Sequence, residues 1–312
     1  MKSFHFVAGF VCVAAVAAST VVADADELRS SIDQRIETVW QANKVKQAEP
    51  ATDAEFLRRV FLDLHGVIPS REEAAAFLDD ASPDKRSKLI DALLEHPRFA
   101  IHQSDVWDLI YFTRNPPGYD TDKRQGFQNW LREQFENDVP YNEWVKSILR
   151  AEGDTVKNGS PMFYVMYKSQ PEDATEAITQ KFLGIQLQCA RCHDHPFEEW
   201  KQTDFYGFAG FLSRLQVVDV GTVDKQKAYA IGEMNTGDVL FTGPVTEQKR
   251  GQKGEPVKPK FLGGDPLVEP ELPEDVKDPR NFPNGKQPPA PHFSRKNALA
   301  DWITSPDNPY FA

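Results

Sequence analysis

The sequence has little cysteine, because only Cys12, Cys189 and Cys192 occur among its 312 residues. Cys12 lies in an N-terminal segment that we predict to be a removable leader. The mature protein then holds two cysteines, both within one short motif. A disulfide in the mature chain can therefore join only Cys189 to Cys192.

Positive charge is also scarce, since 36 Lys and Arg stand against 47 Asp and Glu and the net charge is -11. So acidic a chain argues against nucleic acid or anionic lipid as a partner, and it favours a basic protein partner or none. A Gly-rich phosphate loop, a nucleophile elbow and a paired catalytic motif are all missing. The sequence therefore gives no reason to expect an enzyme in this chain by itself.

Long hydrophobic runs are missing except at the start of the chain. A short positive beginning, Met1-Lys2, precedes an apolar stretch over 6–22, and small residues then lead into the acidic residues that follow Ala23. This order is typical of a secretory signal. An uncleaved anchor is the alternative, although the run is at the lower limit of spanning length. We expect a signal peptide over 1–23 and a periplasmic or extracellular protein without stable membrane insertion after cleavage.

The most informative stretch that is present is Cys189-Ala190-Arg191-Cys192-His193. A CxxCH run in an exported protein is typical of covalent haem c attachment. Two cysteines three residues apart lie on one side of a helical turn, so both sulfurs reach the vinyl edges of one porphyrin. The next residue, His193, is then placed to bind the iron as proximal ligand.

Two other interpretations of the motif stay open. Cys189 and Cys192 would form a disulfide or a free dithiol in a non-haem interaction or scaffold module outside the cytoplasm. Alternatively they would join His193 and His195 in a Cys/His metal site, although structural zinc ligands usually come as two separated pairs. A metal-dependent enzyme would add the acidic neighbours of these histidines, which are Asp194, Glu198 and Glu199.

Helical patterns follow one another from residue 26 to about 214. Apolar residues recur at spacings of three and four, which predicts amphipathic helices. Ser70 and Glu73 predict a capping box, and Ser82 followed by Pro83 predicts an N-cap. The expected helices are 27–46, 54–64, 70–79, 82–95, 97–112, 122–136, 141–150, 170–185 and 204–212. Short helices with brief links predict a mainly α fold, a multi-helix orthogonal bundle.

The pattern changes after Arg214. Runs at 217–220 and 239–242 are β-like, so we expect a small β-rich segment over 215–247. Residues 248–293 are rich in Pro, Gly and charge, and they predict an extended, partly disordered connector with a solvated charge run. A final helix is expected within 294–312. We interpret it as the start of a truncated second region.

The chain resembles a planctomycete cytochrome-c-like domain family, which is exported and of otherwise unknown function. The similarity covers roughly residues 28–215. It is carried by 56–66, FLRRVFLDLHG, and above all by 183–197, LGIQLQCARCHDHPF, with a continuation at 200–207. The resemblance implies that Cys189, Cys192 and His193 hold one covalent haem c. Members of the family usually continue into a further domain beyond the position that matches 308–312.

The second axial ligand is open, with Met166 and His292 as the candidates. Both methionine and histidine serve as axial ligands of haem iron. His195 lies too close to the proximal position to reach the other porphyrin face. Taken together, the sequence predicts an exported electron-transfer protein or domain with one covalent haem, which serves a partner oxidoreductase.

Overall fold

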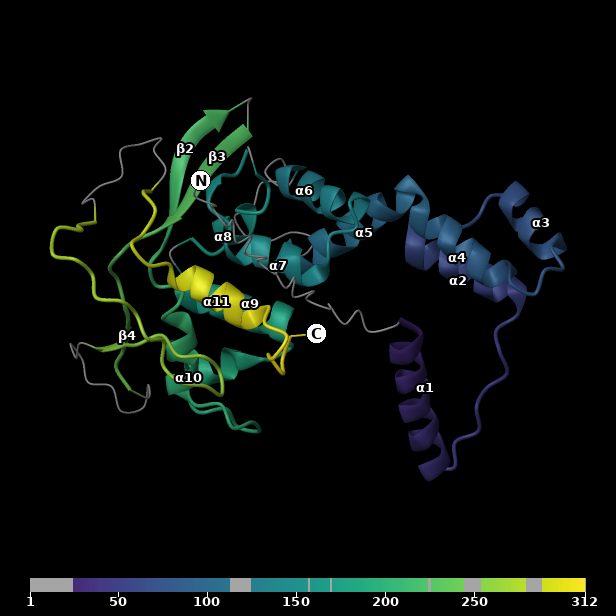
Figure 1. Ribbon diagram of the computed structural model, residues 1–312, viewed down its shortest axis with the longest axis horizontal. Helices are drawn as coiled ribbons and strands as arrows, with labels where there is room; N and C mark the ends of the chain where they lie inside the picture. The colour runs from purple at the N-terminus through teal and green to yellow at the C-terminus, as the bar shows by residue number, and fades with distance from the viewer. Residues whose placement is uncertain are drawn as a thin grey trace, which may run out of the picture. The chain divides into compact units, whose positions relative to one another are not determined.

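The computed structural model describes residues 25–112, 125–156, 158–168, 170–223, 226–243, 254–278 and 288–311 (Figure 1). The expected signal peptide over 1–23 lies outside these residues. The chain divides into two compact units, 1–52 and 53–312. Among the described residues, no helix combines the length and apolar character needed to cross a membrane.

The first unit contains one described helix, α1 (Ala25–Ala42). The sequence predicted this helix over 27–46, so it begins slightly earlier and ends earlier than expected. Its regularly spaced apolar residues are largely exposed: Leu28, Ile32, Ile36 and Val39.

The second unit begins with three helices, α2 (Asp53–His65), α3 (Arg71–Asp79) and α4 (Lys85–Glu95). They enclose a small core of four buried residues, Leu57, Phe61, Phe77 and Leu93. The capping box of α3 is confirmed, because the Glu73 amide donates to Ser70 Oγ and the Ser70 amide donates to Glu73 Oε2.

The predicted cap of α4 is wrong. The Ser82 hydroxyl donates to Asp80 Oδ1 instead of accepting from the first turn of the helix. The helix begins at Lys85, after Asp84, which makes no side-chain capping bond. Ser82 therefore closes a turn with Asp80, a local hydrogen bond that competes with helix capping.

The main core lies among the remaining helices. These are α5 (Pro97–Phe112), α6 (Gln125–Glu136), α7 (Tyr141–Leu149), α8 (Met162–Val165), α9 (Pro171–Leu183), α10 (Gln202–Ala209) and α11 (Arg295–Ile303). Aromatic side chains dominate it, and Tyr111, Phe127, Phe163 and Phe182 are fully or almost fully buried in edge-on and tilted contacts. Edge-to-face packing of this kind adds to the free energy of burying the rings.

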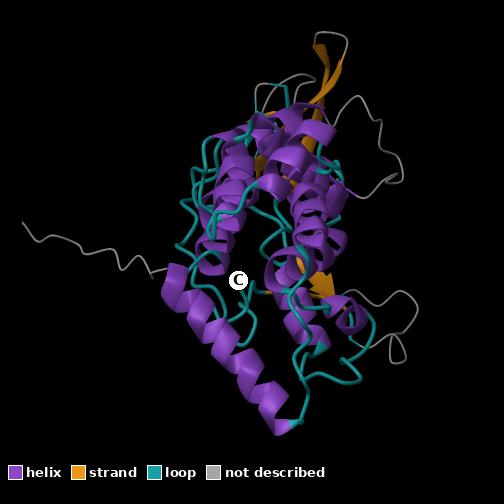
Figure 2. Ribbon diagram, turned by 90° about the vertical axis from the view of Figure 1, so that its right-hand side faces the viewer, coloured by secondary structure: helices purple, strands orange, loops and turns teal. Residues whose placement is uncertain are grey.

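Strands accompany the helices (Figure 2), and the part of the chain that the structure describes contains five of them. The strands β1 (Gly153–Asp154), β3 (Gln226–Glu233) and β2 (Leu215–Val223) form an antiparallel sheet in that order, with a bulge between Asp219 and Gly221. A second pair joins β4 (Val239–Phe241) to β5 (Glu255–Val257). The fold is thus mainly α with a small β-containing C-terminal region, as predicted.

Strand β3 was not predicted, although it is the middle strand of its sheet. Residues 228–233 are all buried, so the alternation of exposed and buried side chains that marks a half-buried strand is missing. Small residues in this run, including Ala228, Ala230 and Gly232, weaken its strand propensity further.

The segment over 248–293, expected to be an extended, partly disordered connector, makes ordered contacts where it is described, at 254–278 and 288–293. It pairs as β5, buries Leu262 and donates from the Lys260 amide to the Gly207 carbonyl oxygen at 2.9 Å. Helix α11 packs on α7. The region after Arg214 therefore folds onto the helices within the same unit.

Candidate functional site

The CxxCH motif begins on a short 3₁₀ helix, η2 (Leu187–Arg191), that follows α9, and Cys192 is the C-cap of this helix. Helix α9 ends at Leu183, and its C-cap Gly184 has a φ of 66°, the left-handed conformation that glycine adopts at low cost. The chain turns back there. The Cys192 amide donates to the Cys189 carbonyl oxygen at 3.4 Å, so one turn carries both cysteines.

The two cysteines are free thiols in this structure. Cys189 is half-buried and Cys192 is exposed. Burial and the nearby Glu172 raise the pKa of the Tyr206 phenol, although Arg191 opposes the rise. Tyr206 in turn stacks on Phe241, with ring centroids 4.8 Å apart. The Tyr206 hydroxyl donates to the carbonyl oxygen of Arg191, the residue before Cys192, so this aromatic pair lies against the motif turn.

Arg191, between the two cysteines, ties the motif to the helices. Its guanidinium contacts Asp173 at 2.8 Å and Glu176 at 3.0 Å, both on α9. Its carbonyl oxygen accepts from Gln202 Nε2 and from the Tyr206 hydroxyl, each at 3.2 Å. Burial alone would lower the pKa of this guanidinium, but the two carboxylates raise it above its usual value. The turn is thus fixed from α9 and from α10.

His193 is exposed, and its Nδ1 lies 2.7 Å from the backbone carbonyl oxygen of Asp194. A carbonyl oxygen only accepts, so Nδ1 carries the proton. The lone pair of the neutral imidazole is then on Nε2, the nitrogen that a metal would bind. A hydrogen bond from the other ring nitrogen is the usual way in which proteins orient a histidine ligand.

His195 has a different role. Its Nδ1 accepts from the Phe197 amide at 3.3 Å and from the Glu198 amide at 2.9 Å. Its own amide donates to the Trp200 carbonyl oxygen at 2.8 Å. We define residues 193–200 as the motif loop. His195 holds this loop in one conformation.

The metal-site interpretation has no assembled set of ligands within the described ranges. No three side chains of His, Cys, Asp or Glu among them are grouped so that they could hold a metal ion. Asp194 instead accepts from the Gln202 amide at 2.9 Å, and Glu198 and Glu199 are exposed on the motif loop. Neither the zinc site nor the metal-dependent enzyme gains support from this geometry.

The two candidates for the second axial ligand lie in different parts of the fold. Met166 caps the C-terminus of α8 and packs half-buried against the main core. The His292 amide donates to Asn235 Oδ1 at 2.6 Å, and His292 lines a cavity of about 290 Å³ together with Arg214 and Glu269. The residues of that cavity do not include the motif. Both candidates stay predictions.

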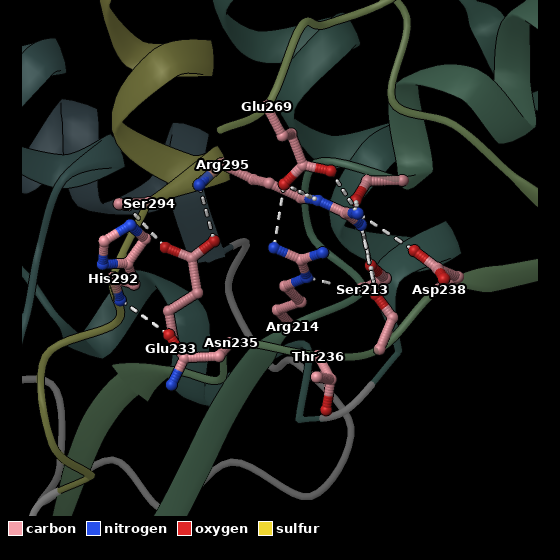
Figure 3. Close-up of polar contacts among 12 residues, drawn as sticks. Ser213, Arg214, Glu233, Asn235, Thr236, Asp238, Glu269, His292, Ser294 and Arg295 are labelled. Carbon is pink, nitrogen blue, oxygen red and sulfur yellow. Dashed lines mark hydrogen bonds and ion pairs between the residues drawn. The ribbon is translucent and has the colours of Figure 1, made fainter. Parts of the chain in front are cut away.

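A second polar cluster, which the sequence did not indicate, surrounds Arg295 (Figure 3). Its side chain is 3% exposed and contacts Glu269 at 2.6 Å and Asp238 at 3.0 Å. It also donates to Ser213 Oγ and to the carbonyl oxygens of Gly210 and Gly237. We call this set the Arg295 network.

Glu233 extends the Arg295 network at the start of α11 (Figure 3). It accepts from the Ser294 hydroxyl at 2.6 Å and from the Arg295 amide at 2.9 Å. Burial raises the pKa of this carboxyl, although Ser294 and Lys296 oppose the rise. Its contacts satisfy the N-terminus of the helix, which favours negative charge. The network therefore has a structural role, and no sequence pattern marks it because its members are far apart along the chain.

The comparisons with known proteins give one family match. A family model described as a protein of unknown function (DUF1549), named PSCyt2, matches residues 31–217, a span that contains the whole CxxCH motif. No curated protein and no solved structure matches the chain. The match covers more than half of the chain, and the protein therefore belongs to the PSCyt2 family of unknown function.

Proposed function

We propose that this protein is an exported, c-type haem-binding electron-transfer domain that serves a partner oxidoreductase. Cys189 and Cys192 would form the two thioether bonds, and His193 would be the proximal ligand of the iron. A bound haem supplies reversible one-electron chemistry, and the chain supplies attachment, orientation and the surrounding surface.

The state of His193 is the observation that carries the proposal. Its Nδ1 donates to the Asp194 carbonyl oxygen, which assigns the lone pair to Nε2. The ring is exposed, directly after the exposed Cys192. An imidazole oriented through one nitrogen, with the other available for iron, is what an axial ligand requires.

The cysteines and their surroundings also fit this group. They are unpaired, they lie on one hydrogen-bonded turn, and Arg191 fixes that turn to α9. Tyr206 and Phe241 provide an aromatic surface against the motif turn, where the Tyr206 hydroxyl donates to the Arg191 carbonyl oxygen. Such a surface can cover part of a porphyrin and exclude water from it.

A dithiol module is the second candidate, and the same free thiols favour it. Cys189 and Cys192 lie three residues apart on a turn, the spacing of thiol pairs that cycle between reduced and oxidised forms. In that case the helices would serve as a scaffold for an interaction outside the cytoplasm. His193 would then have no ligand role.

The mass and absorption spectrum of the mature protein separate the two candidates. The protein should be produced in a host that attaches haem to CxxCH motifs. We expect a Soret band, a mass increased by one haem, and haem that stays bound during denaturing electrophoresis. Cys189→Ala together with Cys192→Ala should remove all three signals.

An unmodified polypeptide mass from the same host, with the thiols free or joined to each other, would contradict the haem proposal and support the dithiol module. Cleavage of the leader is checked in the same sample. The secreted chain should begin at Asp24 or within a few residues of it.

A further inference from the structure

The motif loop holds a large apolar side chain out of the protein. Phe197 is 91% exposed, the highest value among the exposed large hydrophobic residues of the described chain. Isolated exposed apolar residues are common, so exposure alone carries little meaning. What distinguishes Phe197 is that the structure around it is built to keep it exposed.

Three hydrogen bonds fix the backbone on both sides of Phe197. His195 Nδ1 accepts from the Phe197 and Glu198 amides, and the His195 amide donates to the Trp200 carbonyl oxygen at the far end of the loop. Pro196, directly before Phe197, restricts the backbone further. The Phe197 ring is therefore presented from a rigid loop. A side chain that is already ordered loses little conformational entropy when a partner covers it.

The surroundings of Phe197 carry negative charge. Asp194, Glu198 and Glu199 are exposed on the motif loop, and Lys201 follows it. Lys260 near the loop is paired with Asp204 at 3.0 Å. An apolar centre with a charged rim is the arrangement of a protein interface, where a few central aromatic residues carry most of the binding free energy.

A recess lies directly beside the exposed ring. It is an open depression of about 700 Å³ that Phe197, Glu198, Trp200 and Tyr310 help to line, and the rings of Trp200 and Tyr310 are 5.9 Å apart. Glu199, Asp204 and Lys260 also line the recess, so a partner would meet a projecting aromatic side chain beside a hollow with both aromatic and charged walls. This shape is more specific than a flat acidic surface.

We propose that the motif loop is the docking element for a basic redox protein, which places an apolar recess over Phe197 and a rim of Lys or Arg over Asp194, Glu198 and Glu199. The inference rests on the proposed function, since it names the kind of partner that would exchange electrons next to Cys192 and His193. A second copy of this chain or an anionic membrane would bind this surface poorly, because its negative charges would repel the acidic rim.

The test uses a small lysine-rich cytochrome whose exposed haem edge is ringed by ammonium groups. Its binding to the mature protein is measured by calorimetry at low and at physiological salt. Phe197→Ser leaves the charge unchanged, so it separates a specific apolar contact from general attraction of opposite charges. We expect it to weaken binding about tenfold or more. Glu198→Gln with Glu199→Gln should weaken binding mainly at low salt.

Val268→Ser is the matched control, because Val268 is 89% exposed but lies outside the motif loop. It should bind the probe like the parent protein. No binding by the parent, or equal binding by the parent and Phe197→Ser, would overturn the proposal. Dimerisation of the parent protein, or its binding to vesicles, would also overturn the proposal if Phe197→Ser abolished it, because the loop would then bind a different partner.

The docking surface and the haem can fail separately. Calorimetry does not require haem in this protein, so loss of binding in Phe197→Ser supports the surface even where no Soret band is found. In haem-loaded protein, electron exchange with the probe should slow in Phe197→Ser by a similar factor. Reduction by ascorbate should stay unchanged in this variant.

Discussion

The motif loop and the Arg295 network show how differently polar groups are used in one unit of this protein. The loop is mostly exposed, and its hydrogen bonds join residues within a short stretch of chain. The network is centred on an arginine that is 3% exposed, and its partners lie 26 to 85 residues away. The chemistry that we propose lies at the loop, and the buried ion pairs lie at the network.

The physical reason is solvent. An exposed ion pair is screened and contributes little to the free energy of unfolding. A buried charge that loses its partner is left without solvation, which costs several kcal/mol. Substitutions in the network should therefore affect folding, whereas substitutions in the loop should affect function with little effect on folding. The following predictions test this division in order of decreasing effect on stability.

The largest effect is expected for Arg295→Ala. The substitution leaves Glu269 and Asp238 without their guanidinium partner and opens space between β4 and α11. We expect the free energy of unfolding to fall by about 3–5 kcal/mol, measured by urea denaturation of the mature protein. Lys227→Ala, which removes a half-exposed pair with Asp219, is the control and should hardly move the midpoint. Equal urea midpoints for Arg295→Ala and Lys227→Ala would show that the Arg295 network contributes little to the free energy of unfolding.

A smaller effect is expected for Asp278→Asn. Burial opposes ionisation of Asp278, but hydrogen bonds from Thr236 and Asn235 outweigh it and lower the pKa of the carboxyl below its ordinary value of 3.8. The substitution should cost about 1 kcal/mol at pH 7, since the site is partly solvated.

The pH dependence of this cost follows from the direction of the shift. A carboxyl with a lowered pKa in the folded state contributes stability that is present above pH 3.8. That stability is lost as pH falls through the folded-state pKa. The difference between the parent protein and Asp278→Asn should therefore shrink below pH 3.8 in acid titrations followed by circular dichroism. A difference in stability that does not change with pH would show that the substitution acts through side-chain shape and not through loss of the charge.

Arg191→Gln tests the boundary between the two regions, because Arg191 belongs to the motif but contacts α9. Its side chain is 39% exposed, as is that of Asp173. We expect a loss of stability of no more than about 1 kcal/mol. The motif turn should nevertheless move, which would appear as a shifted Soret band or a changed reduction potential in the haem-loaded protein. Arg191→Lys, which keeps the charge, should restore part of that change.

The smallest effect on folding is expected for His193→Ala, because the ring is exposed and its hydrogen bond is to an adjacent residue. The urea midpoint should stay within error of the parent value. The haem spectrum should change most of all the variants, since the proximal ligand is lost. His195→Ala should shift the spectrum only slightly while loosening the motif loop. Equal and large losses of metal binding from both substitutions, without a visible chromophore, would favour a Cys/His metal site.

The elements that the sequence predicted correctly depend on neighbours along the chain. The capping box of α3 needs only Ser70 and Glu73, and amphipathic spacing is enough to place α7 and α9. The prediction at Ser82 was wrong because two local hydrogen bonds compete for one hydroxyl, and the sequence does not say that Asp80 wins. Strand β3 was missed because it is buried along 228–233 and carries no alternation.

The sequence by itself determined the helical class and the CxxCH motif, from which we propose the residues for attachment and ligation. All of these depend on contacts between residues that are close along the chain, so residue type and spacing are enough to predict them. Only the tertiary structure decided that the proline-rich segment after Arg214 folds onto the helices, that Arg295 and Lys296 are buried, and that Phe197 is held outward beside a recess. These outcomes depend on partners many residues apart. The sequence does not show whether a given charged side chain will be exposed to water or buried against an opposite charge.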